Sequence, residues 1–171
     1  MWFVALLTKH LGGGTAVYAQ PILVGGGAVE FYTTGGYATQ DVDLVVFDPQ
    51  PVEAVLAASG FIKVDRYWHA ADCDLLVELP GKTLTYAPGA YDRVVAVTTA
   101  MGVAYVIGLE DILIGRLYAG ISENRPNDLK WAREMALLHS ARLDWHALEQ
   151  LAASNGSALV TAVQHLRQEL G

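Results

Sequence analysis

The pattern of apolar and polar positions changes character at about Gly108. Before this point, short apolar runs rich in β-branched residues alternate with stretches of helical spacing, and glycines or prolines separate them. After it, every periodic segment has helical spacing. Strands are therefore expected at residues 21–24, 42–47, 61–68, 73–79, 94–98 and 103–107. Helices are expected at residues 2–11, 28–32, 51–59, 109–119, 128–139, 143–153 and 157–170.

Polar residues at the ends of these segments suggest how they are connected. Residues 69–72 form a polar interval between two expected strands, which predicts a hairpin turn there. In the helical part, N-caps are expected at Ser122, Asn127, Asp144 and Ser157, because short polar side chains accept hydrogen bonds from the first backbone N–H groups of a helix.

This order of elements predicts an α/β (α+β) fold, in which helices pack on a small mixed β-sheet and a C-terminal helical tail follows. The α/β core is expected at residues 18–107 and the tail, packed on the core, at residues 108–171. Because no Pro/Ser-rich linker separates them, residues 1–171 are expected to form a single domain.

Composition and charge narrow the function. The chain has 171 residues and is 53% hydrophobic, which excludes a disordered protein. A lone cysteine, Cys73, excludes a disulfide scaffold and fits a reducing compartment. The net charge of −7 argues against tight binding of nucleic acid through bulk charge. No apolar run approaches the roughly 20 residues that a membrane span needs, and the opening segment lacks the basic start of a signal peptide. A cytoplasmic protein without membrane contact is expected.

One constellation of residues points to chemistry. Three glycines, Gly25 to Gly27, precede an expected helix whose N-terminal N–H groups can receive a phosphate. Downstream, Asp41 and Asp43 stand two positions apart at the start of an expected strand, so their side chains share one face. Two carboxylates at this spacing can bind hard divalent cations, which prefer oxygen ligands.

The two motifs in this order identify a resemblance. Val24-Gly25-Gly26-Gly27-Ala28 followed by Thr39-Gln40-Asp41-Val42-Asp43-Leu44 resembles the nucleotidyltransferase superfamily of DNA polymerase beta, especially its small prokaryotic members. In outline the resemblance continues through Tyr67-Trp68, Val77-Glu78-Leu79-Pro80 and the segment that opens at Gly108. Some of these small members belong to toxin–antitoxin pairs.

The resemblance implies a role for each matching residue. Gly25, Gly26 and Thr39 would hold the triphosphate, and Asp41 and Asp43 would bind Mg²⁺ or Mn²⁺ together with a third carboxylate on a later strand. Because the superfamily accepts serine at the second glycine, Gly26→Ser is expected to retain nucleotide binding.

Three acids are candidates for the third carboxylate. Glu78 is favoured and Asp74 comes second, since strand alternation gives them a common face, whereas Asp72 falls in the expected turn. The alternative for Glu78 is a solvated acid at the end of a strand. The leaving pyrophosphate also needs a cation, for which Lys82, Arg116, Lys130 and Arg133 are candidates without a choice among them.

The function that follows from the resemblance is metal-dependent transfer of a nucleoside monophosphate from a nucleoside triphosphate such as ATP to a protein, a tRNA or a small molecule. One alternative is a catalytically inactive module that binds a nucleotide or a protein. Another is a structural protein without a ligand, with the glycines in turns and the acids in solvent. In each case the helical tail, rich in Leu and Ala, is a candidate surface for a partner protein or a second copy of the chain.

Overall fold

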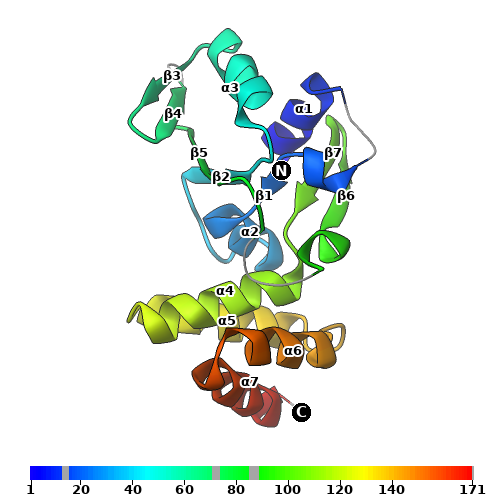
Figure 1. Ribbon diagram of the computed structural model, residues 1–171, viewed down its shortest axis with the longest axis vertical. Coiled ribbons are helices and arrows are strands. Elements are labelled where there is room, and N and C mark those ends of the chain that lie inside the picture. Colours follow the sequence, from blue (N-terminus) through cyan, green and yellow to red (C-terminus); the bar gives the residue numbers. More distant parts are fainter. Residues whose placement is uncertain (13–15, 71–73, 85–88, 171) are drawn as a thin grey trace. The chain divides into compact units, whose positions relative to one another are not determined.

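The computed structural model describes residues 1–12, 16–70, 74–84 and 89–170 (Figure 1). The chain forms two compact units, one comprising Met1–Leu84 and Val94–Ile107 and the other comprising Thr85–Arg93 and Gly108–Gly171. The strands of the described chain lie in the first unit, and the second is helical. The expected α/β fold class with a mixed sheet is confirmed. That residues 1–171 form one domain stays a prediction.

The first unit is built on a seven-stranded mixed sheet with the order β3-β4-β5-β2-β1-β7-β6. The central strands pair in both directions: β2 runs parallel to β5 and antiparallel to β1, and β1 runs parallel to β7. The strand bounds are β1 Ile22–Leu23, β2 Asp41–Val45, β3 Phe61–Val64, β4 Tyr67–Ala70, β5 Leu76–Gly81, β6 Val95–Thr99 and β7 Gly102–Val106.

Helices of the first unit pack on this sheet through apolar residues. Helix α1 (Trp2–His10) contacts β6 and β7, α2 (Gly25–Tyr32) contacts β2, and α3 (Pro49–Ala58) contacts β3; a short 3₁₀ helix, η1, spans Val17–Ala19. Val29 of α2 and Leu44 of β2 are fully buried. The hydroxyl of Tyr32 donates a hydrogen bond of 2.7 Å to the carbonyl of Ile107, which fixes the last turn of α2 next to the end of β7.

The hairpin between β3 and β4 corrects the expected strands. The chain reverses at Asp65 and Arg66, so that Val64 pairs with Tyr67, and residues 69 and 70 belong to β4 rather than to a turn. The predictions of one strand over 61–68 and of a turn at 69–72 were wrong. Asp65 has a φ of +54°, a left-handed conformation that Asp tolerates better than most residues. The expected strand at 73–79 begins at Leu76, and Cys73 lies outside the described residues.

The second unit consists of η2 (Ala90–Arg93), α4 (Leu109–Ser122), α5 (Pro126–Leu138), α6 (Trp145–Asn155) and α7 (Ser157–Leu170). Helix α4 contacts the other three α-helices, and its Leu113 and Ile114 are fully buried. None of the described helices combines the length and the apolar character that crossing a bilayer requires.

The helix ends of this unit test the expected caps. The Asp144 side chain accepts a hydrogen bond of 3.0 Å from the N–H of Ala147, so this cap is confirmed. Ser122 is the last residue of α4 and Asn127 lies inside α5, so those two caps were wrong. Pro126 begins α5 instead, because a proline ring suits the first helical position, where no N–H is needed. Ser157 is itself the first residue of α7.

A buried ion pair joins η2 to α4. Arg93 donates two hydrogen bonds of 2.7 Å to the two carboxylate oxygens of Asp111, whose side chain is only 1% exposed. Arg93→Met would leave this carboxylate buried without its cation, and we expect the free energy of unfolding to fall by about 3–5 kcal/mol. Chemical denaturation measures this loss. Arg133→Met is the control, because Arg133 pairs with the exposed Glu169; an equal loss in both variants would contradict the assignment.

Candidate active site

The two aspartates lie where β2 meets the start of α2. Asp41 and Asp43 occupy alternate positions of the same strand, and their side chains therefore share a face of the sheet. The N–H of Gly26, in the first turn of α2, lies 3.3 Å from Oδ2 of Asp43 and donates to it. The carboxylate is thus held at a helix N-terminus, where the helix dipole favours negative charge.

The glycines belong to the helix instead of preceding it. Helix α2 begins at Gly25, three residues before the expected start at Ala28. Gly25 has a φ of +58°, and a Cβ atom placed on it would lie 1.8 Å from Oδ2 of Asp43. No other residue fits this position, because a side chain would meet the carboxylate and would also strain the backbone. Gly25 therefore allows the close approach of α2 to Asp43.

Gly26 is closely packed against Thr39. A Cβ atom on Gly26 would lie 2.9 Å from Oγ1 of Thr39 and 3.3 Å from Cε1 of Tyr37. A serine at this position would need Thr39 to shift. That Gly26→Ser retains nucleotide binding stays a prediction. The hydroxyl of Thr39 also accepts a hydrogen bond of 3.2 Å from the N–H of Asp41. Thr39 thus lies between the glycine turn and the first aspartate.

The register of the sheet brings Glu78 to the aspartates. Strand β5 runs parallel to β2, and Asp43 pairs directly with Glu78 while Asp41 pairs with Leu76. Paired residues on neighbouring strands project to the same face, so the two aspartates and Glu78 share one. Asp74 is exposed and precedes β5, and Asp72 lies outside the described residues. Within the described parts of the chain, no three His, Cys, Asp or Glu side chains converge closely enough to hold a metal ion.

A cation that the sequence did not single out lies beside Glu78. Arg66, in the turn between β3 and β4, has its Nε 3.4 Å from Oε1 of Glu78 and donates a hydrogen bond of 2.5 Å to the hydroxyl of Tyr67. That hydrogen bond, followed by the charge of Glu78, raises the pKa of the Arg66 guanidinium. The resemblance at Tyr67-Trp68 includes the residue that follows Arg66. Only the position of the turn, which the structure shows, brings Arg66 into contact with Glu78.

The four residues that the sequence suggested as the cation for the pyrophosphate do not contact the two aspartates of β2 in the described structure. Arg116 forms an ion pair of 2.6 Å with Asp128, Arg133 pairs with Glu169, and Lys130 lies over the ring of Trp131. These contacts are all made within the second unit. Lys82 is exposed, next to the end of β5.

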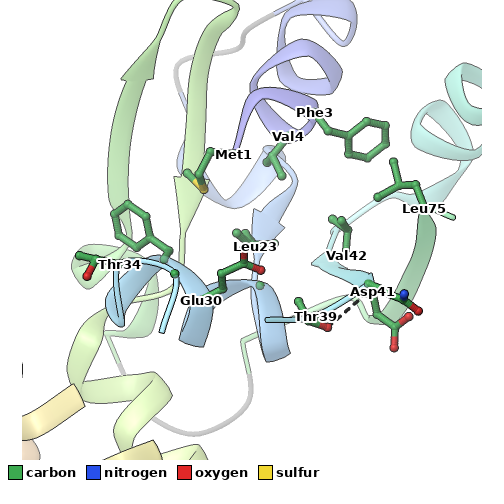
Figure 2. A pocket seen from close by; sticks show the side chains of 14 residues that line it. Met1, Phe3, Val4, Leu23, Glu30, Thr34, Thr39, Asp41, Val42 and Leu75 are labelled. Atoms are coloured by element: carbon green, nitrogen blue, oxygen red, sulfur yellow. Dashed lines mark hydrogen bonds between the residues drawn. The ribbon is translucent and has the colours of Figure 1, made fainter. Parts of the chain in front are cut away.

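A cavity of about 350 Å³ is lined by Asp41, the first of the two aspartates (Figure 2). Its walls include the apolar side chains of Phe3 and Phe31, and its polar groups include Thr39, Asp41 and the carboxylate of Glu30. No Lys, Arg or His side chain occurs among the described residues that line it. The carboxylates of Glu30 and Asp41 disfavour the binding of a phosphate in this cavity. A neutral or positively charged group would suit it better.

The mixed sheet, the glycine turn against Asp43 and the Asp-x-Asp strand agree with the resemblance to the nucleotidyltransferases. Residues 8–169 match the model of a family described as "Nucleotidyltransferase of unknown function (DUF6036)", and the chain belongs to this family. The resemblance inferred from the sequence is confirmed.

A solved structure agrees with this assignment. The chain is similar to the solution structure of the antibiotic-resistance factor ANT(2'')-Ia, with 19% sequence identity, a TM-score of 0.55 and coverage of 96% of each chain. At this identity the likeness shows the fold alone. The curated proteins contain no match to the chain.

Proposed function

We propose that the protein transfers a nucleoside monophosphate from a nucleoside triphosphate, such as ATP, to an acceptor in a reaction that depends on Mg²⁺ or Mn²⁺. The observation that carries the proposal is the placement of Asp41 and Asp43 on one face of β2 with Asp43 against the first turn of α2. Membership of the nucleotidyltransferase family supports a nucleotide as the substrate.

Electrostatics supplies the reason for a metal ion. The N-terminus of a helix such as α2 suits a phosphate, but Asp43 already accepts a hydrogen bond there from Gly26. Two anions at one helix end repel each other unless a cation lies between them. Carboxylate oxygens are the ligands that Mg²⁺ and Mn²⁺ prefer, so the chemistry of Asp41 and Asp43 suits such an ion.

Asp41 and Asp43 would hold the ion, with Glu78 as the third carboxylate and Asp74 as the second choice. When bound, the metal would neutralise the triphosphate and lower the pKa of the acceptor hydroxyl. The chain's own residues supply the remaining features. The backbone at the start of α2 would contact the phosphates, and Thr39 orients the strand at Asp41 through its hydrogen bond to the backbone.

The acceptor is proposed to enter beside Asp41, where the cavity of Figure 2 offers space. A protein, a tRNA and a small molecule remain the alternatives. The net charge of −7 and the acidic lining of the cavity make tRNA the least favoured of the three. From the resemblance we also propose a partner protein, as in a toxin–antitoxin pair, or a homodimer.

One observation favours a second function, a nucleotide-binding module without transfer. Glu78, the favoured third carboxylate, is engaged by Arg66. A site with only two available carboxylates would bind a metal–nucleotide complex but would position the acceptor hydroxyl poorly.

Calorimetry with each of the four ribonucleoside triphosphates, with and without Mg²⁺, tests the proposal. We expect binding of at least one triphosphate that requires the metal. Binding that is equal without Mg²⁺, or no binding of any triphosphate, would contradict the proposal. Incubation of the bound nucleotide, carrying a labelled α-phosphate, with candidate acceptors then separates the two functions, since transfer of the label supports the enzyme and its absence supports the module.

A further inference from the structure

Three side chains form a row across neighbouring strands. Asp43 on β2 pairs with Glu78 on β5, and Glu78 pairs with Tyr67 on β4. Because directly paired residues project to the same face, a carboxylate, a second carboxylate and a phenol follow one another across the sheet. The row begins at the first turn of α2, where the proposal places the triphosphate.

Arg66 lies along this row and contacts two of its members. Its Nε is 3.4 Å from Oε1 of Glu78, its Nη2 donates to the Tyr67 hydroxyl at 2.5 Å, and its guanidinium carbon lies 4.8 Å from the centre of the Tyr67 ring. The guanidinium therefore stands at the carboxylate that is proposed to complete the metal site. Asp43 adds to the negative potential at this guanidinium.

The two partners of the ion pair differ in their freedom to move. The Arg66 side chain is 69% exposed, whereas the Glu78 side chain is 17% exposed and projects from an inner strand of the sheet. Arg66 sits in a two-residue turn, so only its side-chain torsions need to change for it to leave Glu78. Its planar group with several N–H donors is also well suited to contacting phosphate oxygens.

We propose that Arg66 is an exchangeable cation of this site, which neutralises Glu78 in the metal-free protein and contacts the triphosphate once a metal ion has taken the carboxylate. This inference rests on the proposed function. Arg66 thereby has two opposite effects. It competes with the metal for Glu78, and it contributes positive charge to the bound triphosphate. Arg66 would also be the cation that the leaving pyrophosphate needs. The four candidates from the sequence, Lys82, Arg116, Lys130 and Arg133, have no contact with this row in the described structure.

Arg66→Gln tests both effects in one protein. With Mn²⁺ alone as the probe, followed by the electron paramagnetic resonance signal of the free ion, we expect binding to become about two- to fivefold tighter, because an exposed competing charge is lost. With Mg²⁺ and ATP, or whichever triphosphate binds the parent, we expect calorimetry to show about tenfold weaker binding, because charge-assisted contacts to phosphate are lost.

Two variants serve as controls. Lys63→Gln removes the same charge from the same hairpin, but Lys63 pairs with Glu53 and not with the row, so both affinities are expected to stay at the parental values. Arg66→Lys keeps the charge and loses the planar group, so metal affinity should stay near the parent while triphosphate binding weakens in part.

The two affinities of Arg66→Gln must move in opposite directions for the inference to hold. A variant in which both weaken would mean that Arg66 only maintains the structure, and a variant in which neither changes would make it an ordinary surface charge; either result overturns the inference. A parent that binds neither Mn²⁺ nor any metal–triphosphate complex would instead refute the proposed function, and the inference with it.

Discussion

Asp41→Asn and Asp43→Asn are each expected to abolish metal-dependent binding of nucleoside triphosphates. Each change removes a charged oxygen ligand from the proposed metal site. Since loss of a mere supporting group around a metal commonly costs about 10- to 100-fold in affinity, we expect a loss of at least about 100-fold for a ligand. Calorimetry with Mg²⁺ and the triphosphate that binds the parent measures this loss.

The same variants should fold as well as the parent. Like charges a few ångströms apart repel, so removing one of them leaves the stability of the metal-free protein unchanged or raises it slightly. The amide oxygen of an asparagine at position 43 can still accept from the N–H of Gly26, which preserves the first turn of α2. Thermal unfolding without metal provides this check.

Asp74→Asn and Glu78→Gln distinguish the candidates for the third carboxylate. Glu78 is in register with Asp43, whereas Asp74 is exposed and precedes β5, so we expect Glu78→Gln to weaken metal binding and Asp74→Asn to leave it nearly unchanged. The site assignment would be wrong if Asp41→Asn bound metal and nucleotide as well as the parent does. The reverse order of effects at Glu78 and Asp74 would replace only the third carboxylate.

The aspartate pair was predictable because strand alternation is local. Five consecutive residues, Asp41 to Val45, carry the information that two acids share a face and that the strand runs into the core. Glu78 is different. Its proximity to Asp43 depends on the pairing of two strands that are far apart in sequence, and no local pattern fixes that register. The sequence alone therefore left three acids as candidates.

Arg66 was missed for a related reason. The sequence predicts a continuous strand over 61–68, because Asp65-Arg66 lacks the glycine that marks most two-residue hairpin turns. In the structure this turn places Arg66 at Glu78 through the pairing of β4 with β5. A strand that continued through Arg66 would not place its guanidinium at Glu78. Because this turn was not predicted, the sequence did not indicate Arg66 as the proposed cation of the site.

The start of α2 shows how tertiary contacts override local preference. Glycine is a poor helix former, and three in succession predicted a loop before a helix at Ala28. The helix nevertheless begins at Gly25, because only a residue without a side chain can approach Asp43 this closely. Helix propensity cannot indicate this, since the requirement comes from a carboxylate on another strand.

Gly25→Ala is expected to eliminate nucleotide binding, because the new methyl group would occupy the place of the Asp43 carboxylate. The added Cβ would lie 1.8 Å from Oδ2 and 2.6 Å from Cγ of Asp43, so the aspartate must rotate away from the face that it shares with Asp41. The left-handed backbone at φ +58° costs an alanine roughly a further 1–2 kcal/mol of stability.

Gly60→Ala separates the steric effect from the backbone strain. Gly60 also has a left-handed conformation, with a φ of +86°, but a Cβ there meets nothing within 4 Å. It should lose about the same 1–2 kcal/mol in chemical denaturation while retaining the parental affinity for the triphosphate. Gly26→Val is expected to behave like Gly25→Ala, since its side chain would enter the space of Thr39.

The decisive measurement is triphosphate affinity in variants that remain folded by circular dichroism. Gly25→Ala must lose affinity while Gly60→Ala, equally strained, keeps it. A folded Gly25→Ala protein with parental affinity would show that Asp43 can leave its position without consequence for the nucleotide. In that case the close approach of α2 to β2 would serve packing only, and the placement of Asp43 against the first turn of α2 would no longer support nucleotidyl transfer.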